Sequence, residues 1–268
     1  MKNIPHDYYL RFIESSVYDE VLEFHNKGNF TFHGATKGRT VLHRLDEKSL
    51  EQLTGNELAL YPDMDLSLAI NISQDDREGA LYRNESCEEF ASLLLEFSDV
   101  EKLMFPLLSR DLDSCKRGYP SGGALYPAEV FLCSMIEDDP TWPCPGKVLH
   151  LLPKSRKFEV MQIQVAVEEL KAALLFSSNK IGTPSLAIVY AVYMPKNLFK
   201  YRYRAYRMAL MEVGSIYMLV ELQAKLLGLS CRLWSAYTDL MLCKVLGINP
   251  ALFFPMCVHF VGKQHEAY

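Results

Sequence analysis

The stretch from Tyr203 to Leu227 places apolar residues on most of the circumference of a helix. Because a helix on a protein surface buries only one stripe, a circumference this apolar predicts a central or interface helix. Gly228 follows the stretch and predicts a left-handed C-cap. The two apolar faces consist of Met208, Met211, Ser215, Met218, Leu222 and Leu226, and of Ala209, Val213, Ile216, Val220 and Leu227.

Shorter apolar runs on either side of this helix predict strands. The run Leu186–Met194 is almost continuously apolar, as expected of a strand that is buried on both faces. Two runs separated by Pro153–Arg156 predict a hairpin. The predicted strands cover residues 129–136, 147–152, 157–162, 186–194, 230–234 and 256–261.

Further helices are predicted from apolar spacing and from capping signals. Ser86 and Glu89 have the spacing of a capping box, which predicts a helix through Phe90, Leu93, Leu94 and Phe97. Other helices are predicted at residues 16–26, 167–176 and 239–246. Strands and helices interleaved in this way predict an α+β fold, with a mixed sheet and a long central helix.

The N-terminal quarter of the chain differs from the rest. Its predicted helix is followed by an irregular stretch rich in His, Thr and Asp, and then by a short predicted strand at Leu66–Ile72. The polar run Ser73–Glu78 is the best candidate for a linker. The sequence therefore predicts an N-terminal extension at residues 1–75 and a main domain at residues 76–268.

Composition and charge exclude several classes of protein. The 268 residues are 49% hydrophobic and 23% charged, which excludes disordered and fibrous classes. A net charge of −5 argues against nucleic acid as the main partner. We find no signal peptide and no apolar run near the roughly 20 residues of a membrane span. The seven cysteines form no CxxC pair, so we expect reduced thiols, no metal site and a cytoplasmic protein.

A glycine-rich segment is the first of three that could carry chemistry. Residues 117–127 read Arg-Gly-Tyr-Pro-Ser-Gly-Gly-Ala-Leu-Tyr-Pro. The adjacent Gly122 and Gly123 would let the backbone approach a flat or anionic ligand, with N–H groups free to donate. The segment matches neither the P-loop nor the dinucleotide-binding motif, so a simple turn between a helix and a strand remains the alternative.

The second segment, residues 199–207, interleaves four cations with three tyrosines just before and into the long helix. Such a segment could bind nucleic acid by stacking and phosphate contact. It could also supply a phenolate, favoured by the neighbouring cations and competent as a proton acceptor. A solvated helix start with packed tyrosines is the third possibility. The third segment, residues 229–238, is by itself a strand that leaves the core and turns at small residues.

Taken together and in this order, the three segments resemble the azoline dehydrogenases of the nitroreductase-like flavoprotein superfamily. The motifs are Tyr-Pro-Ser-Gly-Gly-Ala-Leu-Tyr-Pro, Lys-Tyr-Arg-Tyr-Arg-x-Tyr-Arg and Trp-x-x-Tyr-Thr-Asp. The resemblance covers residues 110–262 well and extends more loosely to the N-terminus. Within the superfamily, the chain is most similar to the dehydrogenase subunits of synthetases that mature microcin- and bacteriocin-type peptide antibiotics.

The resemblance implies an FMN bound at the interface of a two-fold homodimer. The family loop that contacts the flavin, usually that of the dimer mate, is matched by Ser121, Gly122 and Gly123. The segment whose backbone N–H faces the reducible flavin nitrogen is matched by Trp234, Ser235 and Ala236, where relatives carry Ala-Gly. The Lys-Tyr pair implicated in azoline oxidation is matched by Lys200 and Tyr201.

The phosphate of the flavin is the least clearly matched part. Related flavoproteins hold it with an Arg-rich motif before the first capped helix, and here only Arg77 and Arg83 lie in that region, at imperfect spacing. Arg117 is therefore the cofactor-binding candidate for this group, with Lys116 and Lys263 as other cations that could serve.

Two residues interrupt the apolar pattern of the long helix. Glu212 could be catalytic, but a buried carboxylate that pairs with a nearby arginine is the favoured interpretation. Gly214 costs a helix about 1 kcal/mol relative to alanine, and either a close approach by a cofactor or a partner helix or a tolerated defect would explain it.

The implied reaction is the FMN-dependent oxidation of a peptide thiazoline or oxazoline to the thiazole or oxazole. In it, Tyr201 would act as base and Lys200 would stabilise the phenolate. The implied partners are a precursor peptide and the cyclodehydratase subunits of a synthetase, to which the N-terminal extension would dock. The alternatives are a nicotinamide-dependent nitro- or flavin reductase of the same fold and a non-catalytic scaffold subunit.

Overall fold

The structure is a computed structural model that describes residues 7–29, 46–54, 68, 81–111 and 114–265. The chain forms two compact units, one of Met1–Thr31 with Arg83–Tyr268 and the other of Phe32–Tyr82. The helix described in the second unit is α3 (Glu47–Thr54). The predicted strand at residues 66–72 and the predicted linker at residues 73–78 lie outside the described residues, except for Leu68, which has no regular structure.

The first unit includes α1 (Ser15–Lys27), which corresponds to the helix predicted at residues 16–26. Val17 and Val21 of this helix are buried in the same hydrophobic cluster as one face of the sheet. Because the apolar stripe of α1 packs on the main unit, the structural boundaries lie after residue 31 and before Arg83. They differ from the predicted boundary at residue 75.

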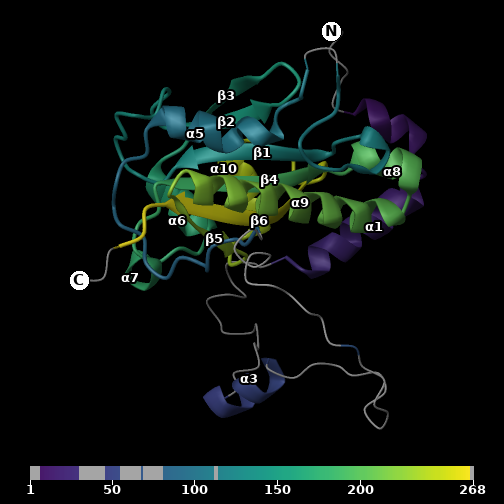
Figure 1. The fold of residues 1–268 in the computed structure, drawn as a ribbon. Coiled ribbons are helices and arrows are strands. Elements are labelled where there is room, and N and C mark those ends of the chain that lie inside the picture. Colours follow the sequence, from purple (N-terminus) through teal and green to yellow (C-terminus); the bar gives the residue numbers. More distant parts are fainter. Residues whose placement is uncertain (1–6, 30–45, 55–67, 69–80, 112–113, 266–268) are drawn as a thin grey trace. The chain divides into compact units, whose positions relative to one another are not determined.

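Six strands of the first unit form one sheet in the order β3-β2-β1-β4-β6-β5 (Figure 1). All of these pairings are antiparallel, so the expected mixed sheet is wrong in this respect. β4 and β5 run in the same direction, as strands joined through a helix do, but β6 lies between them and is antiparallel to both. The strands, which include all six predicted ones, are β1 (Ala128–Ser134), β2 (Lys147–Leu152), β3 (Lys157–Gln164), β4 (Leu186–Tyr193), β5 (Ser230–Trp234) and β6 (Phe253–Gly262).

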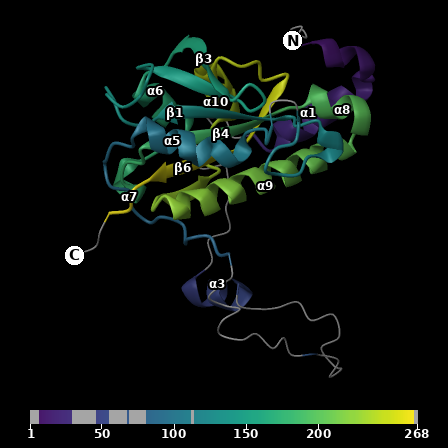
Figure 2. The ribbon, with the colours of Figure 1, turned by 45° about the horizontal axis from the view of Figure 1, so that its top comes forward.

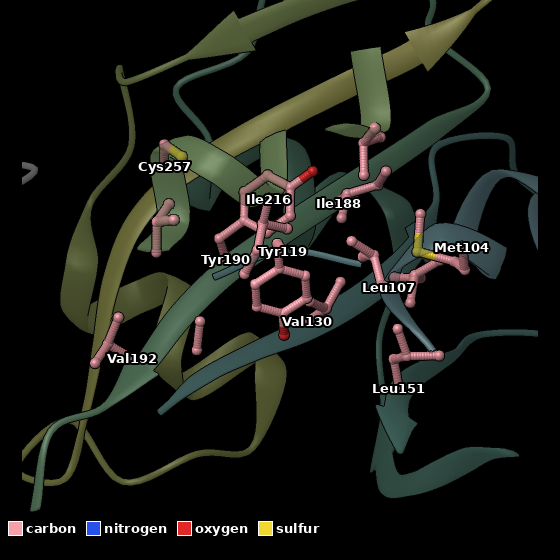
Figure 3. Close-up of a cluster of buried hydrophobic side chains, with 14 of the residues drawn as sticks. Met104, Leu107, Tyr119, Val130, Leu151, Ile188, Tyr190, Val192, Ile216 and Cys257 are labelled. Atoms are coloured by element: carbon pink, nitrogen blue, oxygen red, sulfur yellow. The ribbon is translucent and has the colours of Figure 1, made fainter. Parts of the chain in front are cut away.

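The central strand β4 is buried along its whole length, as its apolar sequence predicts. Its side chains alternate between two hydrophobic clusters, because successive residues of a strand point to opposite faces. Ile188, Tyr190 and Val192 belong to the first cluster, which Figure 3 shows together with Ile216 and Met104. Ala187, Val189 and Ala191 belong to the second.

Helices cover both faces of the sheet (Figure 2). The first cluster is covered by α5 (Phe97–Met104), the short turn η2 (Phe105–Leu107) and the long α9 (Arg204–Leu226). The second is covered by α6 (Val167–Ala173), α7 (Ser178–Ile181) and α10 (Asp239–Leu246). The long helix thus has the predicted position and length, and Gly228 after it has the predicted left-handed φ of +64°.

The helix predicted after the capping box at Ser86 and Glu89 is wrong. Residues 81–96 contain no helix, and α5 begins only at Phe97. The N–H of Phe90 instead donates to the Ile181 carbonyl at 2.8 Å, and its carbonyl accepts the N–H of Thr183 at 3.2 Å. Because these tertiary bonds use the backbone groups that a helix would need, the segment stays extended.

The long helix buries only one of its two predicted apolar faces. Ala209, Val213, Ile216 and Val220 are buried against the sheet. Met211, Met218 and Leu226 of the other face are 61%, 40% and 81% exposed. An exposed row of large apolar side chains on one helix is typical of an interaction surface.

The cysteines agree with the expectation of reduced thiols. All seven are free, and five of them are buried. Among the described residues, no three His, Cys, Asp or Glu side chains gather as metal ligands would. Every helix in the described part of the chain is too short or too polar to cross a membrane.

Candidate functional site

The predicted flavin loop leads into β1 and has an unusual backbone. The φ angle is +65° at Gly123, +55° at Ala124 and +52° at Tyr126. Glycine adopts such angles freely, whereas each non-glycine residue held there carries strain of about 1–3 kcal/mol. Strain of this kind persists only where the surroundings hold it, and it clusters at functional sites.

Hydrogen bonds across the loop hold this conformation. Ser121 Oγ accepts the N–H of Tyr126 at 2.9 Å, and Lys196 Nζ donates to the Tyr126 carbonyl at 2.9 Å. The carboxylate of Glu212 accepts the N–H of Ala128 at 3.2 Å, and the Ser121 hydroxyl lies beside it. The expected pairing with an arginine is wrong as an ion pair, because the hydrogen bond of Glu212 goes to this loop and Arg117 acts on it only through its nearby charge. Burial raises the pKa of Glu212.

Arg117 lies at the base of the same loop. Its guanidinium carbon is 4.3 Å from the ring centroid of Tyr126, and one guanidinium nitrogen donates to the Tyr119 hydroxyl at 2.6 Å. Its backbone N–H donates to the Tyr126 hydroxyl at 3.1 Å. Burial raises the pKa of Tyr119, so this phenol stays protonated. An arginine has five N–H donors, and the remaining ones can hold an anion.

Two other phosphate candidates already have partners in the chain. One guanidinium nitrogen of Arg83 donates to both carboxylate oxygens of the buried Glu221, at 2.9 and 3.2 Å. Lys263 Nζ donates to the Gly228 carbonyl at 3.0 Å. Arg77 lies outside the described residues, and Lys116 is exposed.

Lys200 and Tyr201 form the last turn of α8 (Pro195–Tyr201), a helix not predicted from the sequence. Pro195 in its first turn is the signal that could have predicted it, because proline favours that position. Arg202 then has a φ of +48°, and α9 begins only at Arg204. The second chemical segment is therefore two helices with a sharp turn between them, and the pair sits at the turn.

The Lys200–Tyr201 pair touches the glycine loop. The Cβ of any side chain at position 123 would lie 2.4 Å from the Tyr201 hydroxyl oxygen and 2.9 Å from Lys200 Nζ. Lys200 Nζ is also 5.3 Å from the centroid of the Tyr201 ring. The absence of a side chain at Gly123 is therefore what lets a phenol and an ammonium reach this loop.

The third segment lies near the other edge of the sheet. Trp234 pairs with Val258, which pairs with Val189, and Val189 pairs with Phe131 of β1. Two strands thus separate β5 from β1, which puts them about 14 Å apart. Trp234 packs on the second cluster and Tyr201 on the first, so they lie on opposite faces of the sheet. The structure does not bring this segment to the glycine loop of the same chain.

The turn after β5 offers backbone donors. Trp234 Nε1 donates to the carbonyls of Leu174 and Ala236, each at 2.8 Å, which fixes the turn. Neither Ser235 nor Ala236 has a left-handed φ. Within the described chain, the N–H groups of these two residues have no hydrogen-bond acceptor.

The glycine loop also has backbone N–H groups that no acceptor among the described residues takes. Whether these groups suit the acceptors of a flavin decides whether the loop fits one. No acceptor in the described part of the chain takes the N–H of Gly122 or Gly123. The flavin ring carries carbonyl oxygens and ring nitrogens on one polar edge, and free N–H groups in a glycine turn are suited to such acceptors. The residues present therefore fit the ring, and Arg117 supplies a cation nearby.

Comparison with known proteins places the chain among relatives. A search against protein-family models found no match. A nitroreductase from Ralstonia eutropha JMP134 superposes with a TM-score of 0.58 at 13% identity, over 75% of this chain and 89% of that chain. A chain of the E. coli microcin synthetase McbBCD complex, solved with truncated pro-MccB17 bound, superposes with a TM-score of 0.87 at 34% identity, over 99% of both chains. The microcin B17-processing protein McbC of Escherichia coli is 35% identical over 250 residues, 92% of this chain and 90% of McbC.

The fold and the site define the class, a protein with the nitroreductase-like α+β fold whose glycine loop fits a flavin. Identity of 35% over nearly the whole length is more specific than the fold. The chain belongs to the family of the microcin B17-processing protein McbC. The fold class and the family predicted from the three sequence motifs are confirmed.

Proposed function

We propose that the protein oxidises thiazoline and oxazoline rings of a precursor peptide to thiazoles and oxazoles. The observation that carries this proposal is the contact between the Lys200–Tyr201 pair and Gly123, in a member of the McbC family. It puts a phenol and an ammonium beside a loop that fits a flavin. Bound FMN supplies the redox chemistry, taking up the electrons that the ring loses as it becomes aromatic.

Tyr201 is the proposed general base. The C=N bond of an azoline acidifies the hydrogen on the adjacent ring carbon, and a phenolate can take that hydrogen as a proton. Lys200 stabilises the phenolate through its ammonium charge, which lies over the Tyr201 ring. The role of the loop is to fix these two groups beside the reacting ring, because a proton is transferred only over hydrogen-bond distance.

Two groups of residues are proposed to hold the FMN, one from each copy of a homodimer. In one copy, the glycine loop offers its N–H groups to the ring, and Arg117 offers its charge to the phosphate. In the other copy, the turn after β5 offers its N–H groups to the far side of the ring. The residues concerned are Ser121, Gly122 and Gly123 of the loop and Trp234, Ser235 and Ala236 of the turn.

The homodimer is supported by the exposed face of α9. Met211 and Met218 would be covered by a second copy, and a two-fold contact uses the same face twice. A Cβ added at Gly214 would meet no other side chain of the described residues closer than Tyr217 at 3.9 Å, so another helix can approach this position. The separation of the two flavin-binding groups also favours two copies, because one chain does not bring them together.

The proposed partners are a precursor peptide and the cyclodehydratase subunits that form the azolines. Their support is the similarity to a chain of the McbBCD complex, which holds truncated pro-MccB17. Docking to these subunits is assigned to the N-terminal extension, and within it to the separate unit Phe32–Tyr82, since α1 packs on the main unit. The seven free cysteines support a reducing, cytoplasmic location.

The test is a spectrum followed by an assay on a cyclised peptide. The purified protein should be yellow and release FMN on denaturation. With the peptide, mass spectrometry should show the loss of two hydrogens per azoline ring, and the rings should no longer reopen in acid. Fast NADPH oxidation without peptide would support a nitro- or flavin reductase instead. A protein that stays colourless with excess FMN would support a scaffold.

A further inference from the structure

Glu212 is a buried carboxylate inside an otherwise apolar helix face. It is 3% exposed and sits on α9 between the buried Ala209 and Ile216. Placing a carboxylate there costs free energy unless strong hydrogen bonds compensate for the lost water. The groups that bind this carboxylate therefore indicate the role of Glu212.

Both contacts of Glu212 with neighbouring polar groups of the chain backbone or hydroxyls involve the glycine loop, one at each end. At the end of the loop its carboxylate accepts the N–H of Ala128 at 3.2 Å, and at the start the Ser121 hydroxyl lies beside it. Ser121 Oγ in turn accepts the N–H of Tyr126 at 2.9 Å. Arg117 and Lys196 supply positive charge close to the carboxylate, and both also bind Tyr126.

The segment between these two contacts of Glu212 is the strained one. Ala124 and Tyr126 have positive φ angles that a free chain would leave. Gly123, in the same turn, seats against the Tyr201 hydroxyl and Lys200 Nζ. A release of the loop at either end would therefore move Gly123 away from the proposed base.

We propose that Glu212 is a positioning residue for the oxidation. It clamps both ends of the loop from Ser121 to Ala128, and so holds Gly123 against the Lys200–Tyr201 pair. The link to catalysis rests on the proposed function. The effect of Glu212 on the conformation of the loop does not depend on that function.

The clamp is tested by amide hydrogen exchange on the full-length protein. In Glu212→Ala, the N–H of Ala128 loses its charged acceptor and should exchange about 10- to 100-fold faster. The N–H of Tyr126 keeps its acceptor, Ser121 Oγ, and should exchange faster by a smaller factor as the loop is released. The amides of the central strand β4 should change much less. In Glu212→Gln, the amide oxygen still accepts the Ala128 N–H. The exchange rate of this N–H should therefore return to within about threefold of the wild-type rate.

Glu221 provides the matched control. It lies on the same helix, is 4% exposed and is bound by Arg83, not by the loop. Glu221→Ala should therefore destabilise the protein without a selective change at Ala128 and Tyr126. If Glu212→Ala accelerates exchange evenly across the sheet, as Glu221→Ala does, or leaves Ala128 unchanged, the clamp is wrong.

The link to catalysis is tested by a double-mutant cycle of Ser121→Ala and Glu212→Gln. This cycle can be measured even if Glu212→Ala does not fold. Ser121→Ala removes the hydroxyl, and Glu212→Gln keeps the acceptor for Ala128 but turns an amide N–H₂, which cannot accept a hydrogen bond, toward that hydroxyl. We expect each to lower kcat for azoline oxidation about tenfold with KM for the peptide little changed, and the double variant to be no worse than either. Additive losses would mean that Glu212 does not act through the loop. A wild-type protein without azoline oxidation would overturn the proposed function and leave the exchange result standing.

Discussion

At the scale of single residues, Gly123 has both a left-handed backbone conformation and a contact with the proposed catalytic pair Lys200–Tyr201. Gly123→Ala would strain a φ of +65° and place a Cβ 2.4 Å from the Tyr201 hydroxyl oxygen. We expect azoline oxidation to fall at least about 100-fold, because a displacement of about 1 Å at a reacting group can cost that much. The assay is mass spectrometry of a cyclised peptide.

Gly228→Ala is the matched control for that substitution. Gly228 has nearly the same φ, +64°, but among the described residues its added Cβ would meet nothing closer than Lys263 Nζ at 3.8 Å. This variant should lose about 1 kcal/mol of stability and keep its activity. Equal losses of activity in both variants would mean that backbone strain, and not contact with the Lys-Tyr pair, explains the effect.

Tyr201→Phe separates proton transfer from packing. The change removes one hydroxyl and keeps the ring, so the fold and bound FMN should survive while the peptide stalls at the azoline stage. General-base catalysis contributes about 100- to 10,000-fold, which sets the size of the expected loss. Lys200→Ala should stall at the same stage. Tyr203→Phe, on the exposed side of the turn, should behave as the wild type. Azole formation at the normal rate in Tyr201→Phe would exclude this residue as the base.

At the scale of elements, α1 gives the main unit a pH dependence. His25 of this helix is stacked on Phe254, with ring centroids 4.3 Å apart, and burial lowers its pKa to about 4. An unfolded histidine titrates near pH 6.5, so between pH 6.5 and about 4 the unfolded chain binds a proton that the folded chain excludes. The contribution of the neutral, buried His25 to stability is therefore complete above pH 6.5 and is lost as the pH falls toward 4.

Urea denaturation measures this effect. Between pH 7.5 and 4.5, His25 should account for a loss of about 2 to 3 kcal/mol. His25→Phe keeps an aromatic ring against Phe254 and removes the titrating group, so its stability should fall less over the same range. The same pH dependence in both proteins would contradict the assignment to His25.

The elements also show how far the sequence alone could predict the fold. Sequence patterns predict all six strands and the long helix. The central strand β4 and the helix α9 bury enough apolar surface for their patterns to be read locally, whereas β3 has no buried residue and is predicted through the turn at Pro153–Arg156. The capping box at Ser86 fails since the backbone of Phe90 bonds to Ile181 and Thr183, which lie far away in the sequence. No local pattern contains that partner.

The candidate site likewise combines features that the sequence predicts with contacts that no local pattern contains. The motifs predict, through their resemblance to a family, which segments form the functional site, and this assignment stays a prediction. They did not predict that Gly123 meets Tyr201, because this contact depends on α8, and α8 depends on a turn at Arg202. They also assigned Glu212 to an arginine, since the spacing on a helix cannot show which loop packs above it.

At the scale of the whole molecule, the exposed face of α9 is the proposed interface of the homodimer. Met218→Glu would bury a charge in the proposed two-fold interface, so the dimer should dissociate at concentrations at least about tenfold higher than the wild type. Light scattering at several concentrations measures this. Leu240→Glu, at a side chain 63% exposed on α10, is the control and should remain dimeric. A wild-type protein that binds FMN as a stable monomer would contradict the dimer.

The placement of the two flavin-binding groups on opposite faces of one sheet has a genetic consequence. If each site takes Tyr201 from one copy and the turn at Ala236 from the other, two inactive proteins should complement each other. Tyr201→Phe spoils one contribution, and Ala236→Pro, which removes an N–H, spoils the other. In a mixed dimer both lesions fall in the same site and the second site is intact. Random mixing makes about half of the dimers mixed, so about a quarter of the wild-type activity should return.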